Sequence, residues 1–306
     1  MCIRDRLPPV AEPDNMSLLC PAVLSSGCRF KSANTGQRIF SEFQTVVRLR
    51  RIHRQPGASK YKESLVRLRD GAMTPDDHKL WMEHDLGERD CTFKEAERTN
   101  FEEHVTHLFA ENAGAGDRNG FKAAELARNK PGRTILRVAS RDNTKAAEMQ
   151  SCERFGQHRR VVHLVEGAPV MIISNVCTKA GLVNRSLGTV LAVKLKGELR
   201  REDVQGAVSA SDVDYVVLDV PKFLGAVIFP GHPPWVPIAP QSVRHDLQKG
   251  LERFQLPLTL AWGMTIHKCQ GLTFPDGVVV DFRHSPNTRP VASVGLAFVA
   301  MSRATH

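Results

Sequence analysis

The sequence predicts an α/β fold that is interrupted by a smaller all-β segment. Up to residue 160, apolar runs of strand length alternate with amphipathic helical patterns, and a last apolar run at 256–262 is followed directly by polar and cationic residues. Between 161 and 255, short β-like runs follow one another with no helical pattern between them. A chain of 306 residues is long enough for one large domain or two.

The first part of the chain contains a loop region, a strand and two helices. Residues 11–40 carry clusters of Pro, Ser, Asn and Gly and predict a loop with one short helix at 15–24, and residues 43–49 predict a strand. Apolar residues at 61, 65, 66 and 68 predict an amphipathic helix over 60–70. A second helix is expected to begin at Thr74, which suits an N-cap, and Pro75, which suits the first helical position.

Shorter patterns predict the elements that follow. We expect a strand over 104–110, a helix over 118–129 and a strand over 134–139. In the all-β segment, turns rich in Gly, Pro, Asn and Asp separate six strand candidates, at 161–165, 169–174, 188–195, 214–220, 226–229 and 235–240. Short strands at this spacing predict a small barrel or sandwich.

The last fifty residues carry the most informative chemistry. The run that ends at Trp262 predicts a buried strand, and it is followed by Thr265, His267, Lys268, Gln270 and Gly271. A strand that ends in hydrogen-bond donors and a glycine is a common place for a phosphate-bearing ligand in an α/β sheet. A second apolar run ends in Ser302-Arg303, where burial of an arginine is costly unless it has an anionic partner.

These two segments resemble motifs V and VI of the superfamily-one helicases of the Pif/RecD-like group. The family patterns are L-A-x-A-x-T-x-H-K-[SC]-Q-G-[LM]-[TE] and G-x-[AL]-[YF]-V-A-[LM]-S-R. Residues 260–273 fit the first pattern, with Gly263 in place of the usual alanine, and residues 295–303 fit the second. Upstream, Leu7-Pro-Pro-Val10 resembles the end of motif III, residues 43–55 resemble motif IV, and residues 167–190 resemble the start of an inserted barrel.

The resemblance implies a particular domain organisation. Residues 41–160 together with 256–306 would form the second RecA-like domain of the helicase pair, which is an α/β domain of the P-loop NTPase type. Residues 161–255 would form an inserted small β-barrel. Residues 1–40 would be a remnant of the first RecA-like domain and a linker.

The resemblance also assigns roles at the nucleotide. Arg303 matches the motif VI arginine and Arg54 the motif IV arginine, and both types place a guanidinium on the γ-phosphate of ATP during phosphoryl transfer. Gln55, Gln270 and Gly271 are assigned to the nucleotide cleft, where a glycine permits close approach of the backbone.

The DNA contacts are assigned to the end of the motif V strand. Thr265 and His267 match residues that contact the DNA backbone or sugars without reading the bases. Lys268 is left open between a DNA phosphate and a carboxylate of the same domain. Thr273 stands where many relatives carry a ribose-binding glutamate, so that role is not transferred, and Trp262 and Met264 are expected in the core.

Two motifs that the family carries before motif III are absent from the 306 residues. There is no G-x-x-x-x-G-K-[ST] loop to hold phosphates and no apolar strand that ends in Asp-Glu to hold magnesium. Residues 1–6 do not match the family either. We therefore interpret the chain as a helicase fragment cut at both ends and inactive as an ATPase by itself, with ATP and Mg²⁺ bound mainly by the missing half.

Composition agrees with an intracellular partner of nucleic acid. The formal net charge is +9, and basic residues cluster at 48–54 and 154–160, which suits a polyanion. Seven cysteines without a CxxC pair predict reduced thiols and no zinc site. No apolar run approaches the roughly 18 residues of a membrane span.

We expect the C-terminal part of an ATP-dependent DNA helicase that moves 5′-to-3′ on single-stranded DNA and unwinds duplex. Its partners would be single strands and duplex junctions, it would act as a monomer away from membranes, and it would be nuclear in a eukaryote and cytoplasmic otherwise. DNA repair, recombination and telomere maintenance stay open as pathways. Two alternatives remain, namely a non-enzymatic DNA-binding module derived from a helicase and an RNA helicase of the same superfamily.

Overall fold

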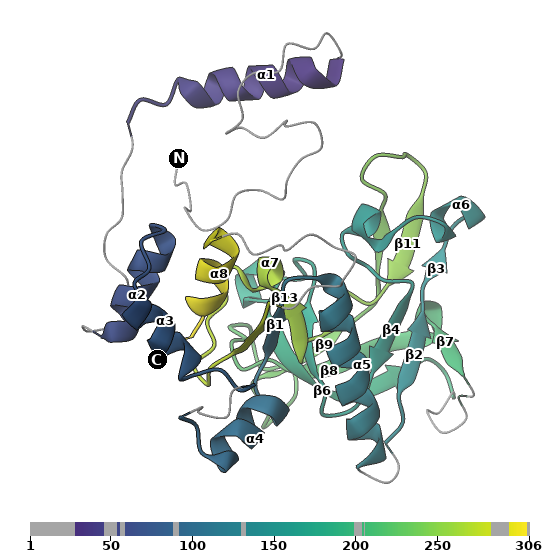
Figure 1. The fold of residues 1–306 in the computed structure, drawn as a ribbon. Coiled ribbons are helices and arrows are strands. Elements are labelled where there is room, and N and C mark those ends of the chain that lie inside the picture. The colour runs from purple at the N-terminus through teal and green to yellow at the C-terminus, as the bar shows by residue number, and fades with distance from the viewer. Residues whose placement is uncertain are drawn as a thin grey trace. The chain divides into compact units, whose positions relative to one another are not determined.

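The computed structural model describes residues 28–45, 54–55, 59–87, 92–129, 133–198, 204, 206–282 and 294–304. The chain divides into two compact units, which are described separately. Unit 1 comprises Met1–Arg98, Thr273–Gly277 and Pro286–His306, and unit 2 comprises Thr99–Leu272 and Val278–Ser285. Figure 1 labels most of the helices and strands.

Unit 1 is helical in its described part. Its helices are α1 (Cys28–Ser41), α2 (Lys60–Arg69), α3 (Pro75–Met82), the first half of α4 (Glu95–Glu103) and α8 (Val294–Met301). Helix α2 packs against α8, and the buried side chains of this region include Leu65 and Leu68 from α2 and Leu296, Val299 and Ala300 from α8. Each buried Leu or Val side chain contributes about 1.5–3 kcal/mol relative to exposure.

The predicted helix over 60–70 and the predicted helix start at Thr74 are confirmed. The Thr74 hydroxyl accepts a hydrogen bond from the Asp77 amide, and the Asp77 carboxylate accepts one from the Thr74 amide, which forms a capping box. The same carboxylate accepts two bonds of 2.7 Å from Arg67 and so ties α2 to α3. The bond from Arg67, followed by the bond from Thr74, lowers the pKa of Asp77.

Two predictions for the N-terminal part are wrong. Residues 28–41 form α1 where a loop was expected, because the stretch has no proline and its Lys, Ala, Gln and Arg residues favour a helix more than its Ser, Asn and Gly oppose it. Residues 43–45 belong to no strand. The helix predicted at 15–24 and the remainder of the strand predicted at 43–49 lie outside the described residues.

Unit 2 contains a parallel sheet. Among the strands that the structure describes, β1 (His107–Phe109) lies between β13 (Gly263–Thr265) and β14 (Val279–Asp281) and is parallel to both. Helix α5 (Asn112–Arg128) follows β1 and contacts β1 and β13. The predicted strand at 104–110 is shorter than expected, and the helix begins six residues before its predicted start at 118.

The strand predicted at 256–262 is confirmed in its middle part. Residues Leu258–Leu260 form β12, which pairs antiparallel with β5 (Pro169–Ile172). The polar residues follow a separate strand, β13 (Gly263–Thr265), in the parallel sheet. The pattern did not predict this second strand, because a continuous apolar run looks the same whether the chain stays in one sheet or passes on to another.

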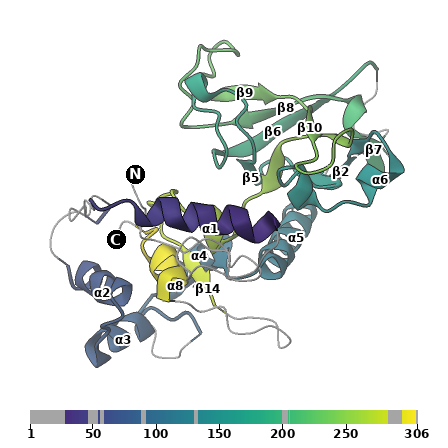
Figure 2. The ribbon, with the colours of Figure 1, turned by 90° about the horizontal axis from the view of Figure 1, so that it is seen from above.

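The all-β part of unit 2 is built from open sheets in the region that the structure describes. One five-stranded sheet has the order β12-β5-β6-β8-β9, with β6 (Leu187–Leu195), β8 (Val213–Asp219) and β9 (Trp235–Ile238). Figure 2 shows β5, β6, β8 and β9 side by side. Two three-stranded sheets have the orders β4-β2-β7 and β10-β11-β3; their strands are β2 (Leu136–Ala139), β3 (Arg141–Asp142), β4 (Val161–Leu164), β7 (Ala207–Ser209), β10 (Gln241–Arg244) and β11 (Glu252–Gln255).

The predicted small β-barrel is not found, because the described strands do not close into a barrel. Strand β9 carries Pro237, which has no amide hydrogen for a further neighbour, and the strand lies at the edge of its sheet. The strand predicted at 226–229 is also wrong, because only an isolated bridge between Phe229 and His232 forms there. The strands predicted at 134–139, 161–165, 169–174, 188–195, 214–220 and 235–240 are confirmed to within a few residues.

The main core of unit 2 lies among these antiparallel strands. Its buried members are aliphatic, chiefly Val and Leu, and include Val138, Leu164, Ile172, Val190, Leu218 and Ile238. Shorter elements connect the strands, namely α6 (Lys145–Glu148), α7 (Ile266–Cys269) and the 3-10 helices η2 (Cys152–Phe155), η3 (Thr178–Ala180) and η5 (Ala210–Asp212). In the described ranges, the helices are too short or too polar to cross a membrane.

Candidate functional site

The residues singled out by sequence form two groups, one in each unit. The arginine cluster, in unit 1, consists of Arg54, Gln55, Thr273, Ser302 and Arg303. The strand-end cluster, in unit 2, consists of Thr265, His267, Lys268, Gln270 and Gly271. Of the residues expected at the nucleotide cleft, Arg54, Gln55 and Arg303 are therefore brought together, whereas Gln270 and Gly271 belong to the other unit.

The arginine cluster joins two distant segments of the chain. Arg54 Nη1 donates to the carbonyl of Ser302 at 2.8 Å, across 248 residues, and Arg54 Nε donates to the Thr273 hydroxyl at 3.0 Å. The segments that resemble motifs IV and VI therefore meet at Ser302, directly before Arg303. Arg54 thus bonds to the backbone of the residue next to Arg303, and the two arginines that sequence singles out are linked through Ser302.

Arg303 is held inside unit 1 in this conformation. Its side chain is fully buried, and Nε donates to the carbonyl of Val299 at 2.8 Å while Nη2 donates to the Ser302 hydroxyl at 2.8 Å. Its own carbonyl accepts from the amide of Phe274 at 3.1 Å. Both ends of the residue are therefore fixed by neighbours.

Side chains from a distant part of the chain bind the end of helix α8 and the residues after it. A helix leaves its last carbonyls without intrahelical partners. The Tyr61 hydroxyl donates at 2.5 Å to the carbonyl of Met301, the last residue of the helix, across 240 residues. Gln55 Nε2 donates at 2.6 Å to the carbonyl of Ala304, just beyond the helix. Burial raises the pKa of Tyr61 to about 12, so the hydroxyl remains a donor at neutral pH. Gln55 is itself 4% exposed and thus has a structural role beside its expected cleft role.

The strand-end cluster lies where β13 passes into the short helix α7. Thr265 is the last residue of β13 and is 6% exposed, whereas His267 and Lys268 are half-buried. Withdrawal from water is the main cause that lowers the pKa of Lys268, and the positive charge of Arg159 lowers it further. A desolvated ammonium beside another cation binds an anion more favourably than a solvated one, because less hydration is lost.

The turn after α7 depends on a glycine and on an arginine from the all-β part. Gly271 has a φ of +95°, in the region that side chains rarely adopt. The carbonyl of Gln270 accepts a 2.5 Å bond from Arg185 Nη1. Arg185 itself has a φ of +77°, which is strained for a residue with a Cβ. The structure therefore holds the motif V turn in place with a side chain that the sequence did not single out.

A second residue missed by the sequence is Asn119 of α5. Its side chain is 9% exposed; Nδ2 donates to the carbonyls of Gly263 at 2.8 Å and Leu260 at 3.3 Å, and Oδ1 accepts from the Gly263 amide at 2.8 Å. Asn119 therefore fixes residues 260–263, where the chain passes from β12 to β13, to helix α5. A Cβ at position 263 would lie 3.0 Å from the carbonyl oxygen of Ala115, which explains why glycine suits this position here.

No metal centre is found in the part of the chain that the structure describes, since it holds no group of three or more His, Cys, Asp or Glu side chains suitably placed.

Comparisons with known proteins agree in sequence and in fold. No family model matches the chain. The chain is 32% identical over 146 residues to the human ATP-dependent DNA helicase PIF1 and 34% identical over 171 residues to the protein of the same name from Danio rerio. These matches cover 47% and 56% of this chain and 18% and 22% of the relatives. The chain thus spans about a fifth of the length of the curated relatives it matches.

Two solved structures extend the likeness over most of the chain. The crystal structure of Pif1 helicase from Candida albicans matches with a TM-score of 0.57 at 25% identity, covering 83% of this chain and 53% of that one. The crystal structure of Bacteroides Pif1 bound to ssDNA matches with a TM-score of 0.53 at 19% identity, covering 88% of this chain and 56% of that one. At that identity the second likeness concerns the fold alone.

Proposed function

Starting from a chain that is similar to Pif1 helicases in both sequence and fold, we propose that it belongs to an ATP-dependent DNA helicase that moves 5′-to-3′ on single-stranded DNA. In this proposal, residues 41–160 and 256–306 form the second RecA-like domain and residues 161–255 form a small β domain inserted into it. Strands β2 and β3, which precede residue 161, hydrogen-bond to strands of that insertion.

The observation that carries the proposal is the bond from Arg54 to the carbonyl of Ser302. It brings the arginines of the motif IV and motif VI segments to one junction. In phosphoryl transfer, the protein mainly positions the reactants and stabilises the charge that develops on the phosphoryl oxygens. Arg303 and Arg54 would supply that charge to ATP, with Arg303 turning outward from Val299 to reach it.

Arg54 and Arg303 would supply only part of the ATP site. Two guanidinium groups suit phosphate oxygens and repel a divalent cation, so Arg54 and Arg303 are not ligands for Mg²⁺. The sequence contains no Walker A loop and no strand that ends in Asp-Glu. We therefore assign the main phosphate and Mg²⁺ contacts to a domain outside these 306 residues, and expect the chain alone to be inactive as an ATPase.

The strand-end cluster is assigned to the DNA backbone. His267 and Lys268 are half-buried donors at the end of a parallel strand, and the chain has a net charge of +9. Donors of this kind position a strand without reading its sequence. Closure of the cleft over ATP would shift this cluster along the strand, and opening after hydrolysis would complete the step.

The test is binding of single-stranded DNA by the 306-residue chain, measured by fluorescence anisotropy over a range of salt concentrations. We expect affinity to fall with salt, with a log–log slope of about −0.7 for each phosphate neutralised. The double variant His267→Ala with Lys268→Ala should weaken binding and flatten the slope, whereas Lys145→Ala, an exposed lysine of α6, should change little. An affinity independent of salt, or an unchanged double variant, contradicts the proposal. RNA of the same sequence as competitor decides between a DNA and an RNA helicase.

A further inference from the structure

Unit 2 contains a pocket of about 310 Å³ between α5 and the strands β4 and β12. Its walls come from α5 (Gly116, Asn119, Gly120 and Ala123), from β4 (Val161, Val162 and His163), from β12 (Leu258, Thr259 and Leu260) and from Ile135 and Arg159. None of the residues that we assign to ATP or to DNA lines this pocket. Its volume is near the lower end for sites that hold small ligands.

The helix wall of the pocket is made by small residues. Gly116, Gly120 and Ala123 lie on one face of α5, at positions i, i+4 and i+7. A Cβ added at Gly116 or Gly120 would meet no atom within 4 Å, so both glycines face open space. Glycine in a helix interior costs about 1 kcal/mol relative to alanine. Because these two positions have no side chain, there is room beside the helix for a flat group.

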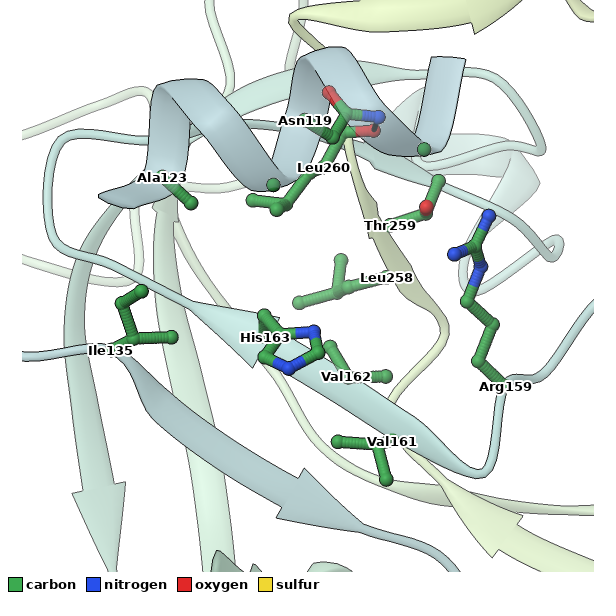
Figure 3. A pocket seen from close by; sticks show the side chains of 12 residues that line it. Asn119, Ala123, Ile135, Arg159, Val161, Val162, His163, Leu258, Thr259 and Leu260 are labelled. Carbon is green, nitrogen blue, oxygen red and sulfur yellow. Dashed lines mark hydrogen bonds between the residues drawn. The ribbon is translucent and has the colours of Figure 1, made fainter. Parts of the chain in front are cut away.

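The two ends of the pocket differ in chemistry. Figure 3 shows Ala123 and Ile135 at one end and Arg159 and Thr259 at the other, with His163 between them. The first end is apolar, and the second carries a cation and a hydroxyl. His163 is exposed on β4, and its partial desolvation, and then the charges of Arg137 and Arg159, lower its pKa. Its ring nitrogens can hydrogen-bond to the edge of a ligand. A nucleotide matches this layout, with its base toward the apolar end and its phosphate toward Arg159.

The cationic end of the pocket adjoins the strand-end cluster. Arg159 is near enough to Lys268 for its charge to contribute to the lowered pKa of that lysine. The backbone of Arg159 is fixed by a hydrogen bond, because Nε2 of the fully buried Gln255 donates to the carbonyl of Arg159 at 3.3 Å. Helix α5, which forms one wall of the pocket, also contacts β13, and β12, which forms another wall, ends three residues before β13 begins. The pocket therefore lies beside the strand that carries the strand-end cluster, with Arg159 on its side.

We propose that this pocket receives the base of one nucleotide of the single strand that the strand-end cluster binds. The inference rests on the proposed DNA function and adds to it a base-holding position beside the phosphate contacts. The faces of the base would lie against Gly120 and the aliphatic wall, and its edge at His163. Binding would depend little on which of the bases occupies the pocket, since every base has a flat apolar face. An acidic peptide is the competing occupant.

The experiment combines an abasic scan with a pocket-filling variant in the 306-residue chain. A short oligothymidylate carries one abasic site at each position in turn, and affinity is measured by anisotropy. We expect one position at which base removal weakens binding about tenfold, the size of a single base contact, and small effects elsewhere. Gly120→Leu should weaken binding of the intact strand by the same factor and abolish the effect of the abasic site, because filling the pocket and removing the base act on one contact.

A matched control separates the pocket from the helix. Ala113→Leu places the same side chain on an exposed position of α5 outside the pocket and should bind as the unchanged chain does. Gly120→Leu should not lower the melting temperature, because leucine favours a helix more than glycine does. If it does lower it, His163→Ala replaces it in the same cycle, with the same loss of position dependence expected.

The outcomes separate this inference from the proposed function. Salt-dependent binding of single strands with no sensitive position, or a sensitive position that survives in Gly120→Leu and His163→Ala, overturns the pocket assignment and leaves the DNA function standing. If an acidic peptide binds the unchanged chain without displacing DNA, and Gly120→Leu abolishes that binding, the pocket belongs to a protein partner. That result overturns the pocket assignment too. Absence of any single-strand binding overturns both.

Discussion

Arg54 donates a hydrogen bond of 2.8 Å from Nη1 to the carbonyl of Ser302, the residue directly before Arg303. The same guanidinium reaches the Thr273 hydroxyl through Nε. Arg54 therefore ties two distant segments of the chain together and is also a candidate phosphate contact. Experiment can separate the two roles. A hydrogen bond to a charged donor contributes about 1.5–3 kcal/mol.

The first prediction concerns Arg303 in a protein that joins this chain to an ATPase half. Arg303→Ala should lower DNA-stimulated ATP turnover by roughly 10³–10⁵-fold, because the charge acts on the transition state. Affinity for single-stranded DNA should stay within about twofold. Arg303→Lys should restore little, since a compact ammonium does not reproduce the planar fork. Turnover is measured at saturating DNA, and an Arg303→Ala protein with half or more of the original turnover would contradict the assignment.

Because Arg303 is fully buried, its loss also disturbs packing. Arg303→Gln is the control for this effect, since an amide retains a donor for the Val299 carbonyl without the charge. Its melting temperature should lie closer to that of the unchanged protein than that of Arg303→Ala, while its turnover stays as low.

Arg54→Ala should show both of the roles described above. We expect turnover to fall by a factor comparable to that of Arg303→Ala, together with a loss of about 1.5–3 kcal/mol in the free energy of unfolding from the broken bond to Ser302. The double variant should be far less than additive in turnover if both arginines serve one transition state. Additive losses in a steady-state ATPase assay would show that the two side chains act in separate steps.

The 306-residue chain alone should release no phosphate from ATP above background. The reason is that the sequence lacks the loop and the carboxylates that hold phosphates and magnesium in such enzymes. The measurement is phosphate release with and without single-stranded DNA. A turnover of about 1 s⁻¹ or more that disappears in Arg303→Ala would refute the prediction.

Asn119→Ala should destabilise unit 2 by about 2–3 kcal/mol. The change removes three hydrogen bonds to Leu260 and Gly263 and leaves buried backbone groups without a partner. Chemical denaturation gives the free energy of unfolding directly. Asn129→Ala, at the exposed end of the same helix, makes a matched control and should cost little. Equal losses in the two variants would mean that Asn119 does not fix the crossing between the sheets.

Stability should fall as the pH is lowered, through His107. Desolvation, and then the charge of Arg118, lowers the pKa of His107 from 6.5 to about 4. Between these two pH values the unfolded chain binds a proton that the folded chain does not, so the free energy of unfolding decreases as pH falls from about 6.5 toward about 4. Denaturation midpoints over this range should show the decrease, and His107→Gln should reduce it. His104→Gln, which changes an exposed histidine, should leave it intact.

Local signals in the sequence predicted the elements that depend on local chemistry. Thr74, Pro75 and Asp77 carry the whole of the α3 cap within four residues, so the helix start could be located. Strands β10 and β11 escaped prediction because their residues are mostly polar. Arg253 and Gln255 of β11 are fully buried, but through partners far away in sequence, such as Asp142 and the carbonyl of Val138.

The sequence named residues for the candidate site, but not the residues that hold them in place. Arg54, Gln55 and Arg303 could be named from the motifs, and the structure brings them together. Asn119 and Arg185 carry no motif, and they act on Gly263 and Gln270 from 144 and 85 residues away. Contacts of that separation depend on topology, which a pattern of neighbouring residues does not encode.

The position of β1 has a consequence for how the protein is made. This central strand of the parallel sheet emerges from the ribosome about 160 residues before β13 and about 170 before β14, the strands that flank it. Until then its backbone groups have no ladder to join, and bringing the ends of an unstructured loop of that length together costs conformational entropy. The antiparallel sheets encoded in between can fold first and shorten the loop. The end of β13 that we assign to DNA is therefore in place only after residues 107–265 have all been made, so a nascent chain cannot engage a single strand there before that point.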